Sequence, residues 1–253
     1  MYIGLDIGGT KIKGVLLADS KKVLAKFIVP TPKNKVVFLK TLEKEITGLT
    51  GSKKIGGIGV GLAVPVGKHG FLEKTSKFPF MGKWNAEQFF KKFNKKVKID
   101  NDARCFLRAE TIIGAAKNKK NVVAMAVGTG IGSGIMINGK IYSGNSNSAG
   151  EIGHTVIDNN KTFEKLAAKS AFLKYGDRSK IIGVGVANMI NILNPDVVVL
   201  GGGGILSGKI NFKIVRTVAA KYIVPPLAKK TPIIKTKLGE LSPAVGAALL
   251  FEK

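Results

Sequence analysis

Short apolar runs alternate with longer amphipathic segments along the 253 residues of the chain. Runs of apolar, β-prone residues predict strands, whereas apolar residues that recur every three or four positions predict helices. We expect strands at residues 2–7, 12–17, 23–29, 58–66, 97–99, 122–127, 135–137 and 197–200. We expect helices at residues 36–49, 84–93, 103–113, 163–175, 180–193 and 243–251. This alternation predicts an α/β protein in which helices cover sheets.

Two glycine-rich segments each follow an expected strand and lead into a returning one. Residues 4–14 read Gly-Leu-Asp-Ile-Gly-Gly-Thr-Lys-Ile-Lys-Gly, and residues 128–134 read Gly-Thr-Gly-Ile-Gly-Ser-Gly. Glycine tolerates backbone angles closed to other residues and lets a ligand approach the main chain. The repetition of strand, Gly-Thr loop and strand indicates an internal duplication, with an active cleft between the two units.

The first glycine-rich hairpin carries groups that suit a phosphate ligand. Backbone N–H groups at its tip, together with the Thr10 hydroxyl and the Lys11 cation, can bind the oxygens of a polyphosphate. The carboxylate of Asp6, on the preceding strand, suits a magnesium ion bound directly or through water. An ordinary glycine-rich turn is the alternative, and the combination of Asp, Thr and Lys favours the ligand site.

The triplet Asp100-Asn101-Asp102 ends one expected strand and begins a helix. Ligands of α/β sheets lie beyond the carboxyl ends of the strands, where a carboxylate can act as a general base and an asparagine can orient a hydroxyl group. Asp is also a favoured N-cap residue, so Asp102 could instead cap the helix. Taken alone, the triplet favours capping.

Composition narrows the class of protein. A hydrophobic content of 45% is ample for a packed core, and two lobes are expected at this length. The single cysteine, Cys105, excludes an intrachain disulfide and a multi-cysteine metal site, and fits a reducing compartment. We expect no signal peptide, because no basic-then-apolar segment stands ahead of Gly4, and no membrane span, because the longest apolar candidate, residues 181–193, is short.

The formal net charge of +25 is the compositional anomaly. Only four of the 41 basic residues are arginines, and the lysines are scattered, with small clusters at residues 91–92, 95–96, 117–120 and 229–230. Readers of nucleic-acid bases usually need arginine forks and a localised basic stripe. The pattern therefore favours a solvated basic surface over nucleic-acid binding, and leaves attraction of a polyanionic small substrate open.

Five motifs occur in a fixed order and together resemble the ROK family, the repressor, open-reading-frame and kinase group of bacterial sugar kinases. They are Asp-Ile-Gly-Gly-Thr-Lys at 6–11, Asn-Asp-Ala at 101–103, Gly-Thr-Gly-Ile-Gly-Ser-Gly at 128–134, Ala-Gly-Glu-Ile-Gly-His at 149–154 and Asn-Pro-Asp-Val-Val-Val-Leu-Gly-Gly-Gly at 194–203. The resemblance runs from residue 3 to about residue 250. It implies the two-lobed fold of actin and hexokinases, built from duplicated ribonuclease-H-like lobes. We expect a small lobe at residues 1–112, with the terminal helix 243–253 packed back on it, and a large lobe at 113–242.

The resemblance also implies roles for individual residues. Asp102 would be the base that takes the proton from the sugar hydroxyl, and the sugar would be bound by Asn101, Glu151, His154 and Glu164. Asp6 would hold Mg²⁺, through water. ATP would be bound by Gly8, Gly9, Thr10, Lys11, Gly128, Thr129 and Gly130 at its phosphates and by Gly201, Gly202 and Gly203 at its adenosine. Lys11 either neutralises phosphate charge or is merely solvated, and Glu151 with His154 could instead form a plain surface loop.

The chain departs from the family pattern in several places. Most members carry a Cys-x-Cys-Gly-x-x-Gly-Cys zinc cluster after the Glu-Ile-Gly-His motif, but here His154 is followed within ten residues by Phe163-Glu164 without any cysteine. No structural zinc is therefore expected. Val66 replaces a usual glycine, Phe80 stands near a usual asparagine, and Arg104 replaces the asparagine that usually follows the Asn-Asp-Ala run. These changes bear on the identity of the sugar more than on the chemistry.

The function implied is that of a cytoplasmic kinase that phosphorylates the 6-hydroxyl of a hexose with ATP, glucose being the first choice. An N-acetylhexosamine, mannose or fructose could be the acceptor instead. A chain without the zinc cluster also resembles the polyphosphate glucokinases of the same family, and the lysine excess would suit that donor. A sugar-sensing regulator is less expected, because the phosphate loop begins at residue 4 and leaves no room for a helix-turn-helix in this sequence. We expect no nucleic-acid or membrane partner, and a homodimer is open.

Overall fold

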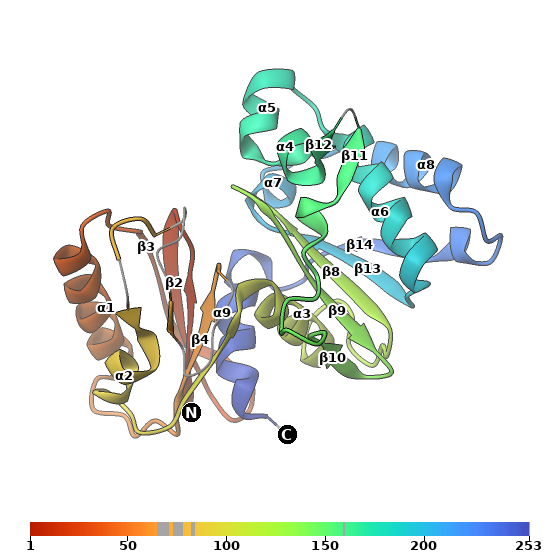
Figure 1. Cartoon of the computed structure of the whole chain (residues 1–253). Helices are drawn as coiled ribbons and strands as arrows, with labels where there is room; N and C mark the ends of the chain where they lie inside the picture. Colours follow the sequence, from red (N-terminus) through yellow and green to blue (C-terminus); the bar gives the residue numbers. More distant parts are fainter. Residues whose placement is uncertain (65–70, 73–77, 82–83, 159, 253) are drawn as a thin grey trace. The chain divides into compact units, whose positions relative to one another are not determined.

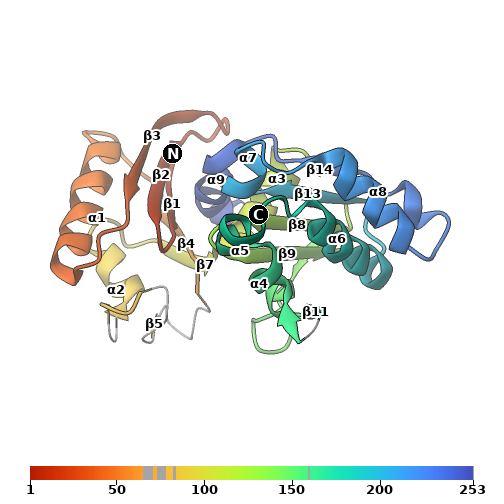
Figure 2. The same ribbon diagram turned by 90° about the horizontal axis from the view of Figure 1, so that it is seen from above.

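The structure is a computed structural model that describes residues 1–64, 71–72, 78–81, 84–158 and 160–252. Contacts divide the chain into two compact units, Met1–Ala109 with Leu241–Lys253 as unit 1 and Glu110–Glu240 as unit 2. Each unit contains a five-stranded mixed sheet with helices packed on it (Figure 1, Figure 2).

Unit 1 has the sheet order β3-β2-β1-β4-β7. Strands β1 (Tyr2–Ile7), β2 (Lys11–Leu17) and β3 (Val23–Pro30) form an antiparallel meander, and β4 (Ile58–Leu62) and β7 (Val97–Asn101) run parallel to β1. A small antiparallel pair joins β5 (Phe71–Leu72) to β6 (Trp84–Asn85). The helices are α1 (Lys35–Thr50), α2 (Ala86–Lys91), α3 (Asp102–Ile112) and α9 (Ser242–Ala248), the last followed by a 3₁₀ turn at Leu249–Phe251; α3 ends beyond the boundary, in unit 2.

Alternation along β1 assigns its two faces to different helices. Ile3 and Leu5 are fully buried and belong to the apolar core that includes Phe38 of α1. The intervening position, Gly4, belongs to the other face, where an added β-carbon would overlap the backbone carbonyl of Ala244 in α9. The glycine therefore lets a helix lie directly on the sheet backbone, and α1 and α9 cover opposite faces (Figure 1).

Unit 2 repeats this plan with the sheet order β10-β9-β8-β13-β14. Strands β8 (Val122–Val127), β9 (Ile131–Ile137) and β10 (Lys140–Tyr142) form the antiparallel meander, and β13 (Val197–Gly201) and β14 (Ile233–Lys235) lie parallel to β8. Its helices are α4 (Phe163–Ala167), α5 (Lys169–Tyr175), α6 (Ser179–Leu193), α7 (Gly203–Leu206) and α8 (Phe212–Tyr222). A short hairpin pairs β11 (Val156–Asp158) with β12 (Lys161–Thr162). The shared strand order confirms the predicted internal duplication.

Some expected elements are wrong in their bounds. The single helix expected at residues 163–175 is two helices, because Ala168 has an extended ψ of 176° between α4 and α5. The strand expected at 135–137 begins at Ile131, so most of the second glycine-rich segment lies within β9 rather than in the loop. Strand β4 ends at Leu62, four residues before the expected end, and Val66 lies outside the described residues.

Helix α8 is not among the expected helices, although its apolar residues Phe212, Val215 and Ala219 follow helical spacing. Across the described part of the chain, no helix combines the length and apolar character that crossing a bilayer requires.

Candidate functional site

The first glycine loop (residues 8–11) joins β1 to β2 at the end of a hairpin whose register pairs Ile7 with Ile12. The next pair outward is Asp6 and Lys13, and the Lys13 Nζ donates to the Asp6 Oδ2 at 2.8 Å. Asp6 is buried, with 4% of its surface exposed, so its charge is stabilised by this ammonium group. A carboxylate beside the first glycine loop is the type of ligand that magnesium prefers, held directly or through water. The metal role of Asp6 stays a prediction, and its ion pair with Lys13 is a contact that the sequence motifs do not indicate.

Backbone hydrogen bonds fix the shape of the first glycine loop. The Gly8 N–H donates to the Lys11 carbonyl at 3.0 Å, which closes the turn. Thr10 and Lys11 are exposed, as a ligand-binding tip requires. Gly8 does not use the left-handed backbone region, so its lack of a side chain matters here rather than its torsion angles.

The catalytic candidate lies where β7 passes into α3. The Asn101 Oδ1 accepts hydrogen bonds from the backbone N–H groups of Ala103 at 2.9 Å and Arg104 at 3.3 Å, so Asn101 is the residue that caps the helix. Asp102 is the first helical residue, and its Oδ1 accepts the adjacent Ala103 N–H at 2.8 Å. Asn101, rather than Asp102, therefore occupies the N-cap position of α3. Its half-buried carboxylate stands at the helix N-terminus, where the helix dipole favours the negative charge.

Arg104 fixes the end of β7 just before this pair. It is buried, and its Nε donates to the Asp100 Oδ1 at 2.6 Å, while the same oxygen accepts the Asn101 N–H at 2.8 Å. Arg108 approaches the second Asp100 oxygen at 3.7 Å. The arginine that departs from the family pattern therefore holds the backbone that presents Asn101 and Asp102.

Cys105, on the same helix, does not supply a nucleophile. Burial, with a smaller contribution from nearby Asp100, raises the pKa of its thiol well above the usual value. The sulfur therefore stays protonated at neutral pH, and a thiol in this state is a poor nucleophile.

The second glycine loop (residues 128–130) connects β8 to β9 in unit 2, and Glu164 lies against it. The Glu164 Oε2 accepts the Ile131 N–H at 2.8 Å, and a β-carbon at Gly130 would overlap this carboxylate. The Gly128 carbonyl accepts the N–H of Lys169, from the start of α5, at 2.9 Å. Thr129 is exposed between these two anchored ends. The loop is thus held by the α4–α5 segment, and its close approach to Glu164 explains the glycine at 130.

The third glycine segment (residues 201–204) follows β13, the parallel neighbour of β8. Gly202 has φ of +86°, and a β-carbon there would lie 2.5 Å from the Val127 carbonyl oxygen. A β-carbon at Gly128 would lie 4.0 Å from the Gly203 nitrogen. The two glycine loops therefore lie side by side at the carboxyl ends of adjacent strands, the place where α/β sheets bind ligands.

A 3₁₀ turn, Ile152–His154, lies on β9. Glu151 precedes this turn, and His154 is its last residue. A β-carbon at Gly150 would come within 2.5 Å of the Ser133 carbonyl, and one at Gly153 would overlap that of Ile131. The His154 Nε2 is 3.8 Å from the Glu151 Oε2, and both side chains are at least half exposed. This turn and Glu164 thus both contact the first residues of β9.

The predicted site residues fall on both units. Unit 1 carries the metal and base candidates, Asp6 and Asp102, with the first glycine loop and Asn101. Unit 2 carries the second and third glycine segments and the predicted sugar-binding residues Glu151, His154 and Glu164. No group of three or more His, Cys, Asp or Glu side chains suited to a metal ion occurs in the part of the chain that the structure describes.

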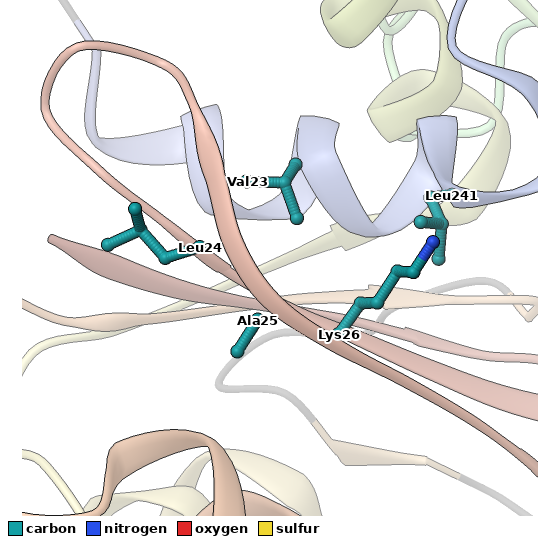
Figure 3. Close-up of a pocket in the computed structure, with 5 residues that line it drawn as sticks. All are labelled: Val23, Leu24, Ala25, Lys26 and Leu241. Atoms are coloured by element: carbon teal, nitrogen blue, oxygen red, sulfur yellow. The ribbon is translucent and has the colours of Figure 1, made fainter.

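A shallow pocket on unit 1 lies apart from these groups. It is lined by Val23, Leu24, Ala25, Lys26 and Leu241, along the edge strand β3 (Figure 3). Four of its five lining residues are apolar, and none carries a carboxylate or a hydroxyl group. It therefore offers no groups for phosphoryl transfer, and the glycine loops and strand ends remain the candidate site.

Comparison with known proteins identifies the family of the chain. The model of the ROK family matches residues 2–165 and 163–253. The xylose repressor of Bacillus spizizenii is 27% identical over 96% of this chain and 75% of its own length. The glucokinase of Thermotoga maritima is 24% identical over 99% of this chain and 97% of its own length. The N-acetyl-D-glucosamine kinase of Haemophilus influenzae is 30% identical over 99% of each chain.

Solved structures show the same fold. A ROK family glucokinase from Streptomyces griseus, in complex with glucose and AMPPNP, has a TM-score of 0.86 at 19% identity and covers 98% of both chains. An inorganic polyphosphate/ATP-glucomannokinase from Arthrobacter sp. strain KM has a TM-score of 0.77 at 26% identity, covering 98% of this chain and 96% of its own. The expected actin- and hexokinase-like α/β fold is confirmed, and the chain belongs to the ROK family.

Proposed function

We propose that this chain is a kinase that transfers the γ-phosphoryl group of Mg-ATP to the 6-hydroxyl of an aldohexose, with glucose as the first choice. The observation that carries the proposal is the pair Asn101 and Asp102. Asn101 caps helix α3, and the Asp102 carboxylate stands at the first position of that helix, directly after strand β7, where a base can meet a bound hydroxyl group. A sugar-sensing regulator would need no such base.

Each residue has a chemical task in this proposal. Asp102 accepts the proton of the attacking sugar hydroxyl, and Asn101, Glu151, His154 and Glu164 orient the sugar through its hydroxyl groups. The three glycine segments bind the phosphates and adenosine of the donor through backbone N–H groups. Asp6 would hold Mg²⁺, and the bound ion would neutralise part of the phosphate charge. Phosphoryl transfer depends mainly on positioning and on this neutralisation, so no covalent intermediate on the protein is required.

Named relatives support a kinase acting on sugars and leave several acceptors open. They include a glucokinase and an N-acetyl-D-glucosamine kinase, and a similar structure holds glucose with an ATP analogue. Inorganic polyphosphate is the second candidate donor, because the polyphosphate/ATP-glucomannokinase is among the similar structures and the net charge of +25 would attract a polyanion. The third glycine segment favours ATP, since polyphosphate has no nucleoside to occupy it.

A coupled assay that crosses a panel of hexoses with two donors tests the proposal. The panel contains glucose, N-acetylglucosamine, N-acetylmannosamine, mannose and fructose, each with Mg-ATP or long-chain polyphosphate. We expect turnover with Mg-ATP and the highest kcat/KM for glucose. Turnover with polyphosphate alone would make the donor assignment wrong, and no turnover with any pair would make the kinase assignment wrong.

Gly202→Ala is expected to raise the KM for Mg-ATP about tenfold or more, with little change in the KM for the sugar. The new β-carbon meets the Val127 backbone, and torsion angles of φ +86° and ψ 168° cost roughly 1–3 kcal/mol for a residue other than glycine. Steady-state kinetics with each substrate varied separately measure the effect. Gly139→Ala is the matched control, because Gly139 also has positive φ, of +78°, but has open space around it. Equal donor KM values in both variants would contradict the placement of Gly202 at the donor site.

A further inference from the structure

Residues 31–34 join β3 to α1, and this segment lies against the first glycine loop and binds its backbone. The Thr31 Oγ1 donates to the Gly8 carbonyl at 2.6 Å, and the Lys33 Nζ donates to the Gly9 carbonyl at 2.6 Å. The Thr31 N–H donates to the Thr10 carbonyl at 2.9 Å. Three consecutive carbonyl groups of the loop are therefore bound by two residues that none of the motifs contains.

These bonds also determine where the loop N–H groups point. In a planar trans peptide the C=O and the following N–H point in opposite directions. Binding the Gly8 carbonyl to Thr31 therefore directs the Gly9 N–H away from Thr31, and binding the Gly9 carbonyl to Lys33 directs the Thr10 N–H away from Lys33. Successive N–H groups presented in this way form a concave site for an anion.

The segment itself is anchored at both ends. It follows the last residue of β3, Pro30, and precedes Asn34, whose side chain caps helix α1 by accepting the N–H groups of Val36 and Val37. Thr31 is buried, with 5% of its surface exposed, so its hydroxyl is held in place. Lys33 is exposed, and its ammonium group lies at the loop tip beside a neutral carbonyl. A phosphate oxygen is a stronger partner for an ammonium group than a neutral carbonyl is.

We propose that Thr31 and Lys33 are part of the donor site: Thr31 positions the loop N–H groups, and Lys33 binds the phosphoryl oxygens of a polyphosphorylated donor. This inference rests on the proposed function, since it assumes that the first glycine loop binds donor phosphates. The chemistry is shared by a nucleoside triphosphate and by inorganic polyphosphate. Lys33 thus contributes one of the lysines of this basic chain to a specific task.

Calorimetric titration of the full chain with tripolyphosphate and, separately, with Mg-AMPPNP tests the inference. Thr31→Val removes the hydroxyl donor but keeps the backbone N–H, and Lys33→Met removes the cation. We expect each variant to bind both ligands about tenfold more weakly, the effect of losing one charge-assisted or positioning hydrogen bond. Thr31→Ser, which keeps the hydroxyl, should bind like the wild type. Lys26→Met, an exposed lysine on neighbouring β3, controls for the loss of one positive charge.

The outcomes separate this inference from the proposed function. Kd values within twofold of the wild type in both Thr31→Val and Lys33→Met would overturn the inference, even if the wild type phosphorylates sugar. Weakening of Mg-AMPPNP binding alone would also overturn it, because the contact must be with the phosphoryl chain that both ligands share. Weakened binding of both ligands in a protein that phosphorylates no sugar would support the inference and make the proposed function wrong. A wild type that binds neither ligand would overturn both.

Two further measurements distinguish a specific loss of donor binding from a general loss of structure. Thermal unfolding reports whether Thr31→Val folds, and kinetics report the KM of each substrate. A raised KM for the donor with an unchanged KM for the sugar supports positioning of the loop. An equal rise of both constants would show a general loss of structure and would contradict the assigned role.

Discussion

Asp102→Asn is expected to lower kcat for sugar phosphorylation by about 10²–10⁴-fold, the usual contribution of a general base. The substitution keeps the shape of the side chain and the helical position next to the Asn101 cap, so the fold and sugar binding should persist. Only the ability to accept the hydroxyl proton is lost. Steady-state kinetics give kcat, and calorimetry with the sugar alone shows whether the acceptor still binds.

The matched control for this variant is Asp19→Asn. Asp19 is an exposed carboxylate of unit 1 that pairs with the N-terminal ammonium group and lies in neither glycine loop. The kcat of the Asp19→Asn variant should equal that of the wild type. If Asp102→Asn kept more than about a tenth of the wild-type kcat, the assignment of Asp102 as the base would be wrong.

Gly59→Ala is expected to have the largest effect on stability, lowering the free energy of unfolding by about 2–3 kcal/mol or more. Gly59 lies in β4, and a β-carbon there would overlap the backbone carbonyl of Ala247 in α9. Both partners are backbone, so no side chain can turn aside, and the helix must lift from the sheet. Urea unfolding followed by circular dichroism measures the change.

Gly48→Ala provides the opposite expectation for the same chemical change. Gly48 lies exposed within helix α1, and no atom stands within 4 Å of an added β-carbon. This variant should gain roughly 0.5–1 kcal/mol, because alanine loses less conformational entropy in a helix than glycine does. If the two variants were equally stable, the backbone contact between α9 and β4 would be contradicted.

The sequence predicts most of the fold where local signals agree with tertiary packing. The strand expected at residues 122–127 is β8, because a six-residue apolar run between polar segments suits a strand buried on both faces. The break at Ala168 could not be predicted, since neither Ala168 nor its neighbours carry a helix-breaking signal. That break is stabilised by the bond from Lys169 to Gly128, a contact between residues distant in sequence.

For the candidate site, the motifs locate the loops but not the residues that support them. Asn101 is named for sugar binding, yet its hydrogen bonds show it also capping α3. The Asp6–Lys13 pair could have been deduced, because the two residues stand equally far from the tip of the expected hairpin. Thr31 and Arg104 could not, since their roles depend on partners that only the folded chain brings into contact.

Direct identification of the product tests the central claim most directly. Wild-type protein is incubated with glucose and Mg-ATP, and ³¹P NMR follows the phosphorus signals against an Asp102→Asn sample prepared in parallel. We expect glucose 6-phosphate and ADP to appear in equal amounts with the wild type and to be absent on the same time scale with the variant. Failure to form any sugar phosphate with glucose or the other hexoses of the panel, from protein that binds both substrates, would contradict it.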